Sequence, residues 1–331
     1  MLLYRWGKIL NNRMYHLRKS GVGIVVDIVR YLILIAFAYI FIYPLLFMVI
    51  NALKHPSDWY DPTVQWVPKQ LSIDSFKVAI KAMDFWRSLS NTFFYEMIPS
   101  LLQFCSCAVA AYGLSRFNFK GKKVMVALLF MNILIPVTMI IIPSYVNFRY
   151  TDFFGILGII NKLTGYDLRP NLLNTPFVFW LPAILGVGLK GGLITYIYTK
   201  FFSDLPKELE EASWIDGAGP IKTFLYVVLP SSGAVCITTL IFSVIWYWSE
   251  YYLPLMLLSD NYPISVSLSK LTNGVEFSKV QASLTSGSLN SLNIGSALMA
   301  GSLLYLIPML IFYLIMQKRF VTSIATSGIV G

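Results

Sequence analysis

Long apolar runs follow one another along the chain, each close to the ~20 residues that a helix needs to cross the hydrocarbon core of a bilayer. These six runs cover residues 28–53, 89–115, 124–146, 177–202, 231–258 and 294–316. A helix satisfies its own backbone hydrogen bonds inside lipid, which a lone extended segment cannot do. The pattern therefore predicts an all-α, polytopic membrane protein with six transmembrane helices.

The longest polar interruption of the second half, residues 203–230, is predicted to form two short helices around a glycine turn. Asp204 can cap the first helix, and Asp216-Gly217 ends it because glycine accepts left-handed backbone. Gly219-Pro220 then begins a second helix with apolar residues at helical spacing. One face of the first helix comprises Leu205, Leu209, Ala212 and Ser213. Its charged residues, expected mostly on the other faces, are Lys207, Glu208, Glu210 and Glu211.

Several residues of this interruption follow a recognisable spacing: Glu211, Ala212, Ser213, Asp216, Gly217, Ala218, Phe224, Leu229 and Pro230. The spacing resembles the EAA loop of membrane subunits of ATP-binding-cassette importers. Ser213 stands where that family usually has a second alanine, and it is small enough to keep close helix packing. The resemblance implies that residues 203–230 are a cytoplasmic coupling loop that docks on an ATPase subunit. The alternative is an ordinary amphipathic loop between two spans.

Matches to the carbohydrate-uptake branch of this family lie outside the loop, at Asn91, Thr92, Ala110, Ala111, Tyr112, Arg116, Phe117, Gly121, Pro136, Pro143 and residues 317–321. Over residues 28–325 the chain is similar to the second membrane subunit of maltose-type importers. The resemblance implies a transport subunit that acts on a sugar or oligosaccharide and binds no cofactor of its own. Its implied partners are a homologous permease in a heterodimer, an ATPase dimer with ATP and Mg²⁺, and an extracellular or periplasmic solute-binding protein.

The composition agrees with a membrane protein, since 56% of residues are hydrophobic and 13% are charged, against ~25% charged in soluble domains. The net charge of +10 could indicate nucleic acid or anionic lipid. Basic residues gather in residues 1–27 and in the short loop 116–123, which indicates membrane orientation and lipid contact instead of nucleic acid. We therefore expect a bacterial cytoplasmic membrane protein with both termini inside, built from a basic tail (1–27), a permease domain (28–320) and a tail (321–331).

The sequence argues against chemistry within this chain. Its three cysteines all lie in apolar runs and suggest neither a disulfide framework nor a metal site. A phosphate-binding loop needs two spaced glycines, a lysine directly after the second, and then a hydroxyl residue. The stretch at Gly121 lacks the upstream glycine and the hydroxyl, and the stretch at Gly219 lacks the glycine before its lysine. The energy for transport must therefore come from a partner. Two alternatives remain open: an importer permease for another solute, such as a peptide or phosphonate, and a polytopic membrane enzyme.

Ionisable residues within apolar runs are candidates for the substrate path, because they are costly to insert. Glu250 follows Trp246 and Trp248 and precedes Tyr251. Aromatic rings can stack on the C–H faces of sugars, and a carboxylate accepts hydrogen bonds from their hydroxyls. The alternative is that Glu250 pairs with a partner subunit and the rings pack at that interface.

Lys190 lies in a glycine-rich stretch, residues 186–192, where glycines permit close backbone approach or loosen the helix. It could bind an acidic sugar or pair with Glu250 or Glu96. Alternatively, the fourth span begins later than the apolar run and the lysine reaches out to the interface. Glu96 itself is expected near the outer interface, one turn into the second span.

Overall fold

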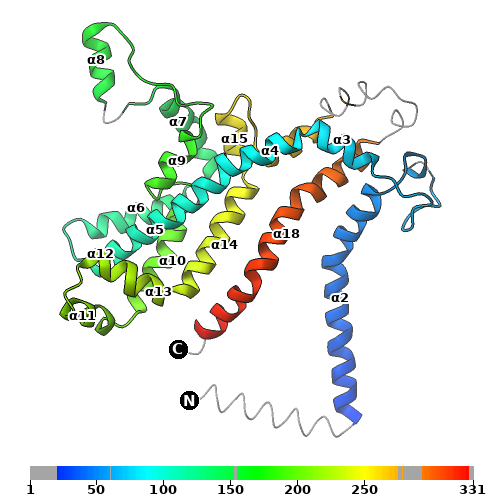
Figure 1. The fold of residues 1–331 in the computed structure, drawn as a ribbon, viewed down its shortest axis with the longest axis horizontal. Coiled ribbons are helices and arrows are strands. Elements are labelled where there is room, and N and C mark those ends of the chain that lie inside the picture. Colours follow the sequence, from blue (N-terminus) through cyan, green and yellow to red (C-terminus); the bar gives the residue numbers. More distant parts are fainter. Residues whose placement is uncertain are drawn as a thin grey trace.

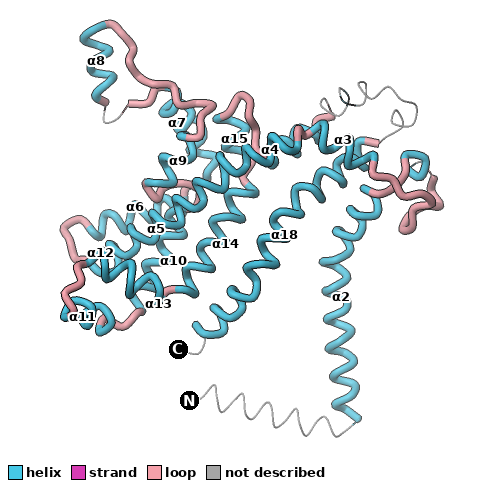
Figure 2. The backbone as a smooth tube through the Cα atoms, viewed as in Figure 1, coloured by secondary structure: helices cyan, strands magenta, loops and turns pink. Residues whose placement is uncertain are grey.

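A computed structural model describes residues 21–59, 61–152, 155–274, 278, 280 and 293–327. Within these ranges all regular elements are helices, and Lys54 and Leu71 form an isolated bridge (Figure 2). The predicted all-α class is confirmed for this part of the chain. Most of the basic tail, residues 1–20, lies outside the described residues, as do residues 281–292 between the fifth and sixth apolar runs and the last residues, 328–331.

Three helical stretches are long and apolar enough to cross a membrane: residues 23–52, 85–116 and 294–318. They correspond to the first, second and sixth apolar runs. The first is α2 (Gly21–Ala52), which begins inside the segment assigned to the basic tail. The second combines α4 (Phe85–Thr92), the π-helix η2 (Phe93–Met97) and α5 (Ile98–Arg116). The last is α18 (Ile294–Ser327), which continues through most of the segment predicted as a tail.

The other apolar runs are bent or broken. Helices α6 (Lys122–Leu134) and α7 (Val137–Arg149) meet at 106°, next to Pro136, which has no backbone N–H to continue a helix. Residues 220–231 meet α14 (Gly233–Ser249) at 85°. Counting each bent pair as one span gives up to five spans among the described residues.

The fourth apolar run is not one helix, because residues 185–190 separate α9 (Phe177–Ile184) from α10 (Gly191–Asp204). The predicted count of six spans is therefore not confirmed. The elements that complete the described chain are η1 (Pro56–Trp59), α3 (Asp74–Ala82), α8 (Ile156–Thr164), α11 (Glu208–Ile215), α12 (Pro220–Thr223), the π-helix η3 (Phe224–Val228), α13 (Leu229–Ser231), α15 (Tyr252–Leu257) and α16 (Ile264–Thr272).

Helix α5 is central to one half of the bundle, where α9, α10 and α14 pack on it (Figure 1). The core there is aromatic: Tyr198 and Phe202 of α10 are fully buried, with ring centroids 5.4 Å apart. Helix α18 packs on α2, α3, α14 and α16 and forms the other half. In Figure 1, the start of α2 and the end of α18 lie on the same side of the bundle as α11, whereas α8 lies on the opposite side.

Candidate functional site

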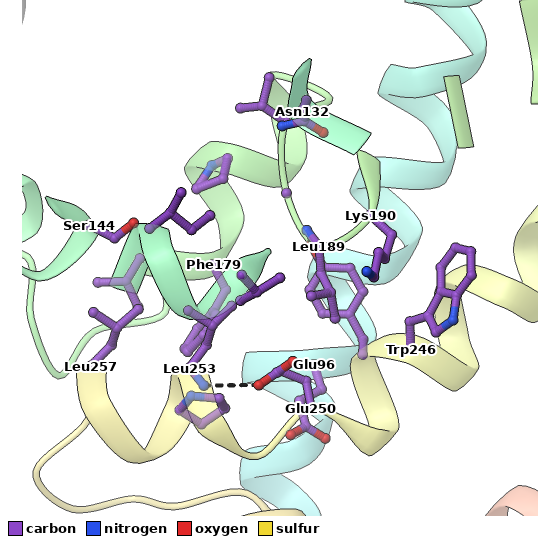
Figure 3. Close-up of a pocket in the computed structure, with 18 of the residues that line it drawn as sticks. Glu96, Asn132, Ser144, Phe179, Leu189, Lys190, Trp246, Glu250, Leu253 and Leu257 are labelled. Atoms are coloured by element: carbon purple, nitrogen blue, oxygen red, sulfur yellow. Dashed lines mark hydrogen bonds between the residues drawn. The ribbon is translucent and has the colours of Figure 1, made fainter. Parts of the chain in front are cut away.

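A cavity of about 540 Å³ lies where the helices break (Figure 3). Its walls come from η2, the α6–α7 bend, α9, residues 187–190, the first turn of α10, the end of α14, and α15. Irregular backbone at membrane depth is tolerated where protein buries it or where it lines a cavity. The α6–α7 bend and the α9–α10 break therefore belong to one feature, a pocket inside the bundle.

A buried hydrogen-bond network holds the break between α9 and α10. The Gln103 side-chain amide of α5 donates to the carbonyl of Leu189 at 2.6 Å. The Tyr247 hydroxyl of α14 donates to Gln103 Oε1 at 2.9 Å, and the amide of Leu189 donates to that hydroxyl at 3.3 Å. These bonds satisfy backbone groups that a continuous helix would have paired internally. The break is thus a fixed structure, held by side chains of two other helices.

Glycines are required at this break because neighbouring atoms come very close. A Cβ added at Gly188 would lie 2.3 Å from Gln103 Oε1, and one at Gly191 would lie 2.3 Å from the carbonyl oxygen of Gly186. Both distances are far below van der Waals contact. Close backbone approach, one of the two roles expected for these glycines, is present at Gly191, and the local loosening is a full break between α9 and α10.

Glu96 lies in the cavity wall, within the π-helix η2, and only 1% of it is exposed. Its Oε1 accepts a hydrogen bond from Ser265 Oγ of α16 at 2.9 Å. Its Oε2 has no hydrogen-bond partner among the described residues. The sequence assigns Glu96 only a position near the outer interface, because the seryl partner and the cavity come from segments far along the chain.

Glu250 also lines the cavity, at the point where α14 ends. Its Oε1 accepts from the backbone amides of Tyr252 and Leu253 at 2.8 and 3.0 Å. Those amides open α15 and have no partner within that helix, so the carboxylate caps it. Glu250 therefore occupies a junction between two helices and not the middle of a span.

Lys190 lines the same cavity and directly precedes α10, with left-handed backbone (φ 56°). It is exposed, and it is absent from the ion pairs of the described residues, so neither Glu96 nor Glu250 pairs with it. The fourth run is helical from Phe177 to Ile184 and again from Gly191, so it is broken at Lys190 and does not simply begin later.

The aromatic candidates divide between two environments. Trp246 lines the cavity, with its ring stacked on Phe242 at 5.3 Å between centroids. Trp248 is buried against Tyr305 of α18, with centroids 5.6 Å apart, because residues two apart in a helix point in nearly opposite directions. Trp248 and Tyr251 are not part of the cavity lining, and Tyr251 lies against Tyr252. Of the predicted substrate-path residues, the structure brings together Lys190, Trp246 and Glu250.

The polar interruption 203–230 contains the two expected helical segments and the glycine turn. Helix α11 ends at Ile215, Gly217 has φ 81°, and α12 begins at Pro220. The expected cap is wrong, because Asp204 is the last residue of α10 and forms an exposed ion pair with Lys200 at 3.3 Å. The chain turns between α10 and α11, so Asp204 lies too far before α11 along the chain to reach the first amides of that helix.

Glu210 of α11 points into the protein, on a different face from Leu209, and it is the apolar face that is exposed. It is 3% exposed, and its Oε1 lies 2.5 Å from Arg116 Nε, a contact of opposite charges without hydrogen-bond geometry. The Tyr112 hydroxyl donates to Glu210 Oε2 at 3.2 Å, and Arg116 also donates to the carbonyl of Leu205 at 3.0 Å. The sequence analysis singled out Tyr112 and Arg116 as matches to the family, but it did not identify Glu210 as the residue that they contact.

The outward side of α11 and the segment after it carries an apolar surface. Ile215 is 87% exposed and Tyr226 is 77% exposed. This surface, called here the outer patch, consists of Leu209, Trp214, Ile215, Ile221, Leu225 and Tyr226. Among the motif residues, Glu211, Ala212, Asp216 and Gly217 are exposed, while Ser213 and Ala218 are half-buried. Large apolar side chains gathered on the exposed part of one segment typically mark contacts with protein or membrane.

A family model described as "Binding-protein-dependent transport system inner membrane component" matches residues 105–326, about two thirds of the chain. The chain belongs to this family. Among the described residues, no group of three or more His, Cys, Asp or Glu side chains could hold a metal ion.

Two relatives of this permease illustrate the family. A probable starch degradation products transport system permease protein of Thermoanaerobacterium thermosulfurigenes is 22% identical over 295 residues, covering 89% of this chain and 94% of its own. A trehalose transport system permease protein of Mycobacterium tuberculosis is 23% identical over 290 residues, covering 87% and 92%. The predicted membership in the importer permeases is confirmed.

A solved structure shows the same fold. It is described as a bacterial ABC transporter involved in the import of the acidic polysaccharide alginate, and its matching chain superimposes on this permease with a TM-score of 0.71. The match covers 91% of this chain and 98% of the other, at 22% sequence identity. The broken helices of this permease therefore belong to a fold that a solved transporter also has.

Proposed function

We propose that this chain is the permease subunit of a binding-protein-dependent importer, and that it forms the translocation path for a sugar or oligosaccharide. The observation that carries this proposal is the cavity at the helix breaks, where Trp246 supplies an aromatic face and Glu96 and Glu250 supply carboxyl groups. A ring beside hydrogen-bonding groups matches a sugar, which has apolar C–H faces and hydroxyl edges. The relatives named for starch products and trehalose support the same substrate class.

The second part of the proposal is that residues 203–230 couple transport to ATP hydrolysis by a separate ATPase subunit. The support is the outer patch, whose apolar side chains project from short helices that Glu210 fastens to α5 through Arg116. A surface of this kind suits a protein groove. When the ATPase dimer closes around ATP and Mg²⁺, the segment moves as a rigid lever and shifts the spans.

The remaining partners follow from this reading. A second, homologous permease completes the membrane path, a solute-binding protein delivers the sugar from outside, and the chain itself supplies no catalytic group. The permease lies in the bacterial cytoplasmic membrane with both termini inside. That orientation is supported by Figure 1, in which the start of α2 and the end of α18 lie on the same side of the bundle as α11.

The test is purification of the permease in mild detergent from its own membrane, followed by ATPase assays in liposomes with binding protein and a panel of oligosaccharides. We expect an ATPase subunit to co-purify and one class of glycan to stimulate hydrolysis. Absence of a co-purifying ATPase would remove the coupling proposal. Stimulation by a peptide or phosphonate, with none by any glycan, would replace the sugar proposal.

A further inference from the structure

Glu96 lines the cavity, and its Oε2 is a buried polar atom that the described chain leaves without a hydrogen-bond partner. The other carboxyl oxygen, Oε1, lies 2.9 Å from Ser265 Oγ, whose single hydroxyl proton is shared with the backbone carbonyl of Glu250 at 3.0 Å. A buried polar atom without a partner is costly, and native proteins rarely keep one without a reason. Glu96 therefore has one carboxyl oxygen that is bonded and one that can still form a hydrogen bond.

The backbone around Glu96 is also unusual. Residues Phe93–Met97 form a π-helix, in which the amide of Ile98 bonds to the carbonyl of Phe93. Single π-turns within α-helices are rare and occur frequently at functional sites. The two observations are independent, one from backbone and one from side-chain bonding, and both concern the same wall of the cavity.

We propose that Glu96 is a specificity-determining residue, which hydrogen-bonds a hydroxyl of an uncharged carbohydrate and, with Glu250, disfavours anionic sugars. This inference rests on the proposed function and names the substrate class of its cavity. A hydroxyl both donates and accepts, so it can satisfy Glu96 Oε2 whether the carboxyl is ionised or protonated. A sugar carboxylate only accepts, and it would be brought close to groups of its own charge.

The charged residues that line the cavity also favour an uncharged substrate. Its lining has two carboxyl groups, Glu96 and Glu250, and one basic side chain, Lys190 (Figure 3). Glu96 is buried and held by Ser265, whereas Lys190 is exposed and its side chain has no ion pair within the described chain. The fixed part of the lining is thus acidic, and the basic group is the adaptable part.

The experiment measures uptake and stimulated ATPase activity of the complete transporter in liposomes, with one binding protein and two oligosaccharides of equal length, one neutral and one carrying a uronate. Because the same binding protein serves every variant, its own preference cancels when variants are compared. We expect E96A to lower kcat/KM for the neutral sugar about tenfold or more. We expect E96Q to stay within about threefold of wild type, because its amide can also donate and accept.

Two further variants complete the design. The double variant E96Q/E250Q should shift the preference toward the uronate relative to wild type, since both carboxyl groups are gone. Thr238→Ala, a change on α14 outside the cavity lining whose hydroxyl only bonds the Ala234 carbonyl of its own helix, should stay within about twofold and is the control. If E96A does not assemble, Ser265→Ala should still lower neutral uptake severalfold by releasing the Glu96 carboxyl.

The outcomes separate cleanly. The role of Glu96 would be overturned if E96A took up the neutral sugar as fast as the wild type does. It would also be overturned if the wild-type transporter preferred the uronate and Lys190→Gln abolished that preference. Absence of stimulation by any carbohydrate in the wild type would instead overturn the proposed function, and this inference with it.

Discussion

Glu210 and Arg116 form a buried ion pair between two segments that are distant in sequence. Glu210 lies on α11 within the polar interruption, and Arg116 is the last residue of α5; their side chains are 4% and 8% exposed. The Tyr112 hydroxyl adds a hydrogen bond to the same carboxylate. Because the acid of α11 faces inward, the apolar residues of the outer patch face outward. One ion pair thus sets which surface the segment presents to a partner.

We predict that Arg116→Ala lowers the free energy of unfolding by about 3–5 kcal/mol, because it strands a buried charge on Glu210. Thermal unfolding of the purified permease in detergent measures the loss. The double variant Arg116→Met with Glu210→Met should recover much of it, since no unpaired charge remains buried. Equal stability of the single variant and the double variant would contradict this account.

The Lys200–Asp204 ion pair provides the matched control, since it joins the same two kinds of charge with side chains that are 67% and 64% exposed. Lys200→Ala should cost under about 1 kcal/mol, because water already solvates both groups. The comparison separates the effect of burial from the effect of charge pairing in general.

The turn at Gly217 should be essential for coupling. Gly217→Pro conflicts with its φ of 81°, because proline fixes φ near −65°. We expect this change to uncouple ATP hydrolysis from uptake, as should a bulky residue at the exposed Ala212. Substrate-stimulated ATPase activity and uptake are measured together; a variant that is normal in both would contradict the lever. Gly219→Ala is the control, since φ there is −80° and an added Cβ meets no atom within 4 Å.

Gly191 should tolerate no side chain. In Gly191→Ala the new Cβ would lie 2.3 Å from the backbone oxygen of Gly186, and relieving that overlap should cost about 1–3 kcal/mol and deform the cavity. Gly113→Ala, in α5 with no atom within 4 Å of the added Cβ, should instead stabilise the helix by about 0.5–1 kcal/mol. Unfolding curves of both variants measure the two changes in stability. A similar change in stability for Gly191→Ala and Gly113→Ala would contradict this prediction.

The two tryptophans at the end of α14 should separate transport from stability. Trp246→Ala removes a half-buried cavity ring and should reduce uptake about tenfold, equivalent to about 1.4 kcal/mol, with a smaller loss of stability than Trp248→Ala. Trp248→Ala empties a buried site against Tyr305 and should cost about 3–5 kcal/mol of stability. Uptake assays and unfolding curves on both variants check the separation; matching effects would show that the two residues act alike.

The sequence alone determined the features that depend on neighbours along the chain. Apolar runs of sufficient length predicted an all-helical membrane protein, because a segment of that composition must bond its own backbone in lipid. The turn at Gly217 and the helix start at Pro220 were predictable for the same reason, since each depends on the local backbone preferences of one or two residues.

Only the tertiary structure decided which polar groups are buried and what they face. The sequence set Glu210 apart from the apolar face of its helix, but it did not pair that acid with Arg116 of α5. The surroundings of Glu96 became visible only when the structure placed Ser265 and the cavity beside it. The break in the fourth run is stable because Gln103 and Tyr247 bond the backbone groups that the break leaves free. A buried polar group is stable only with a partner, and these partners come from helices far along the chain, which no local pattern reveals.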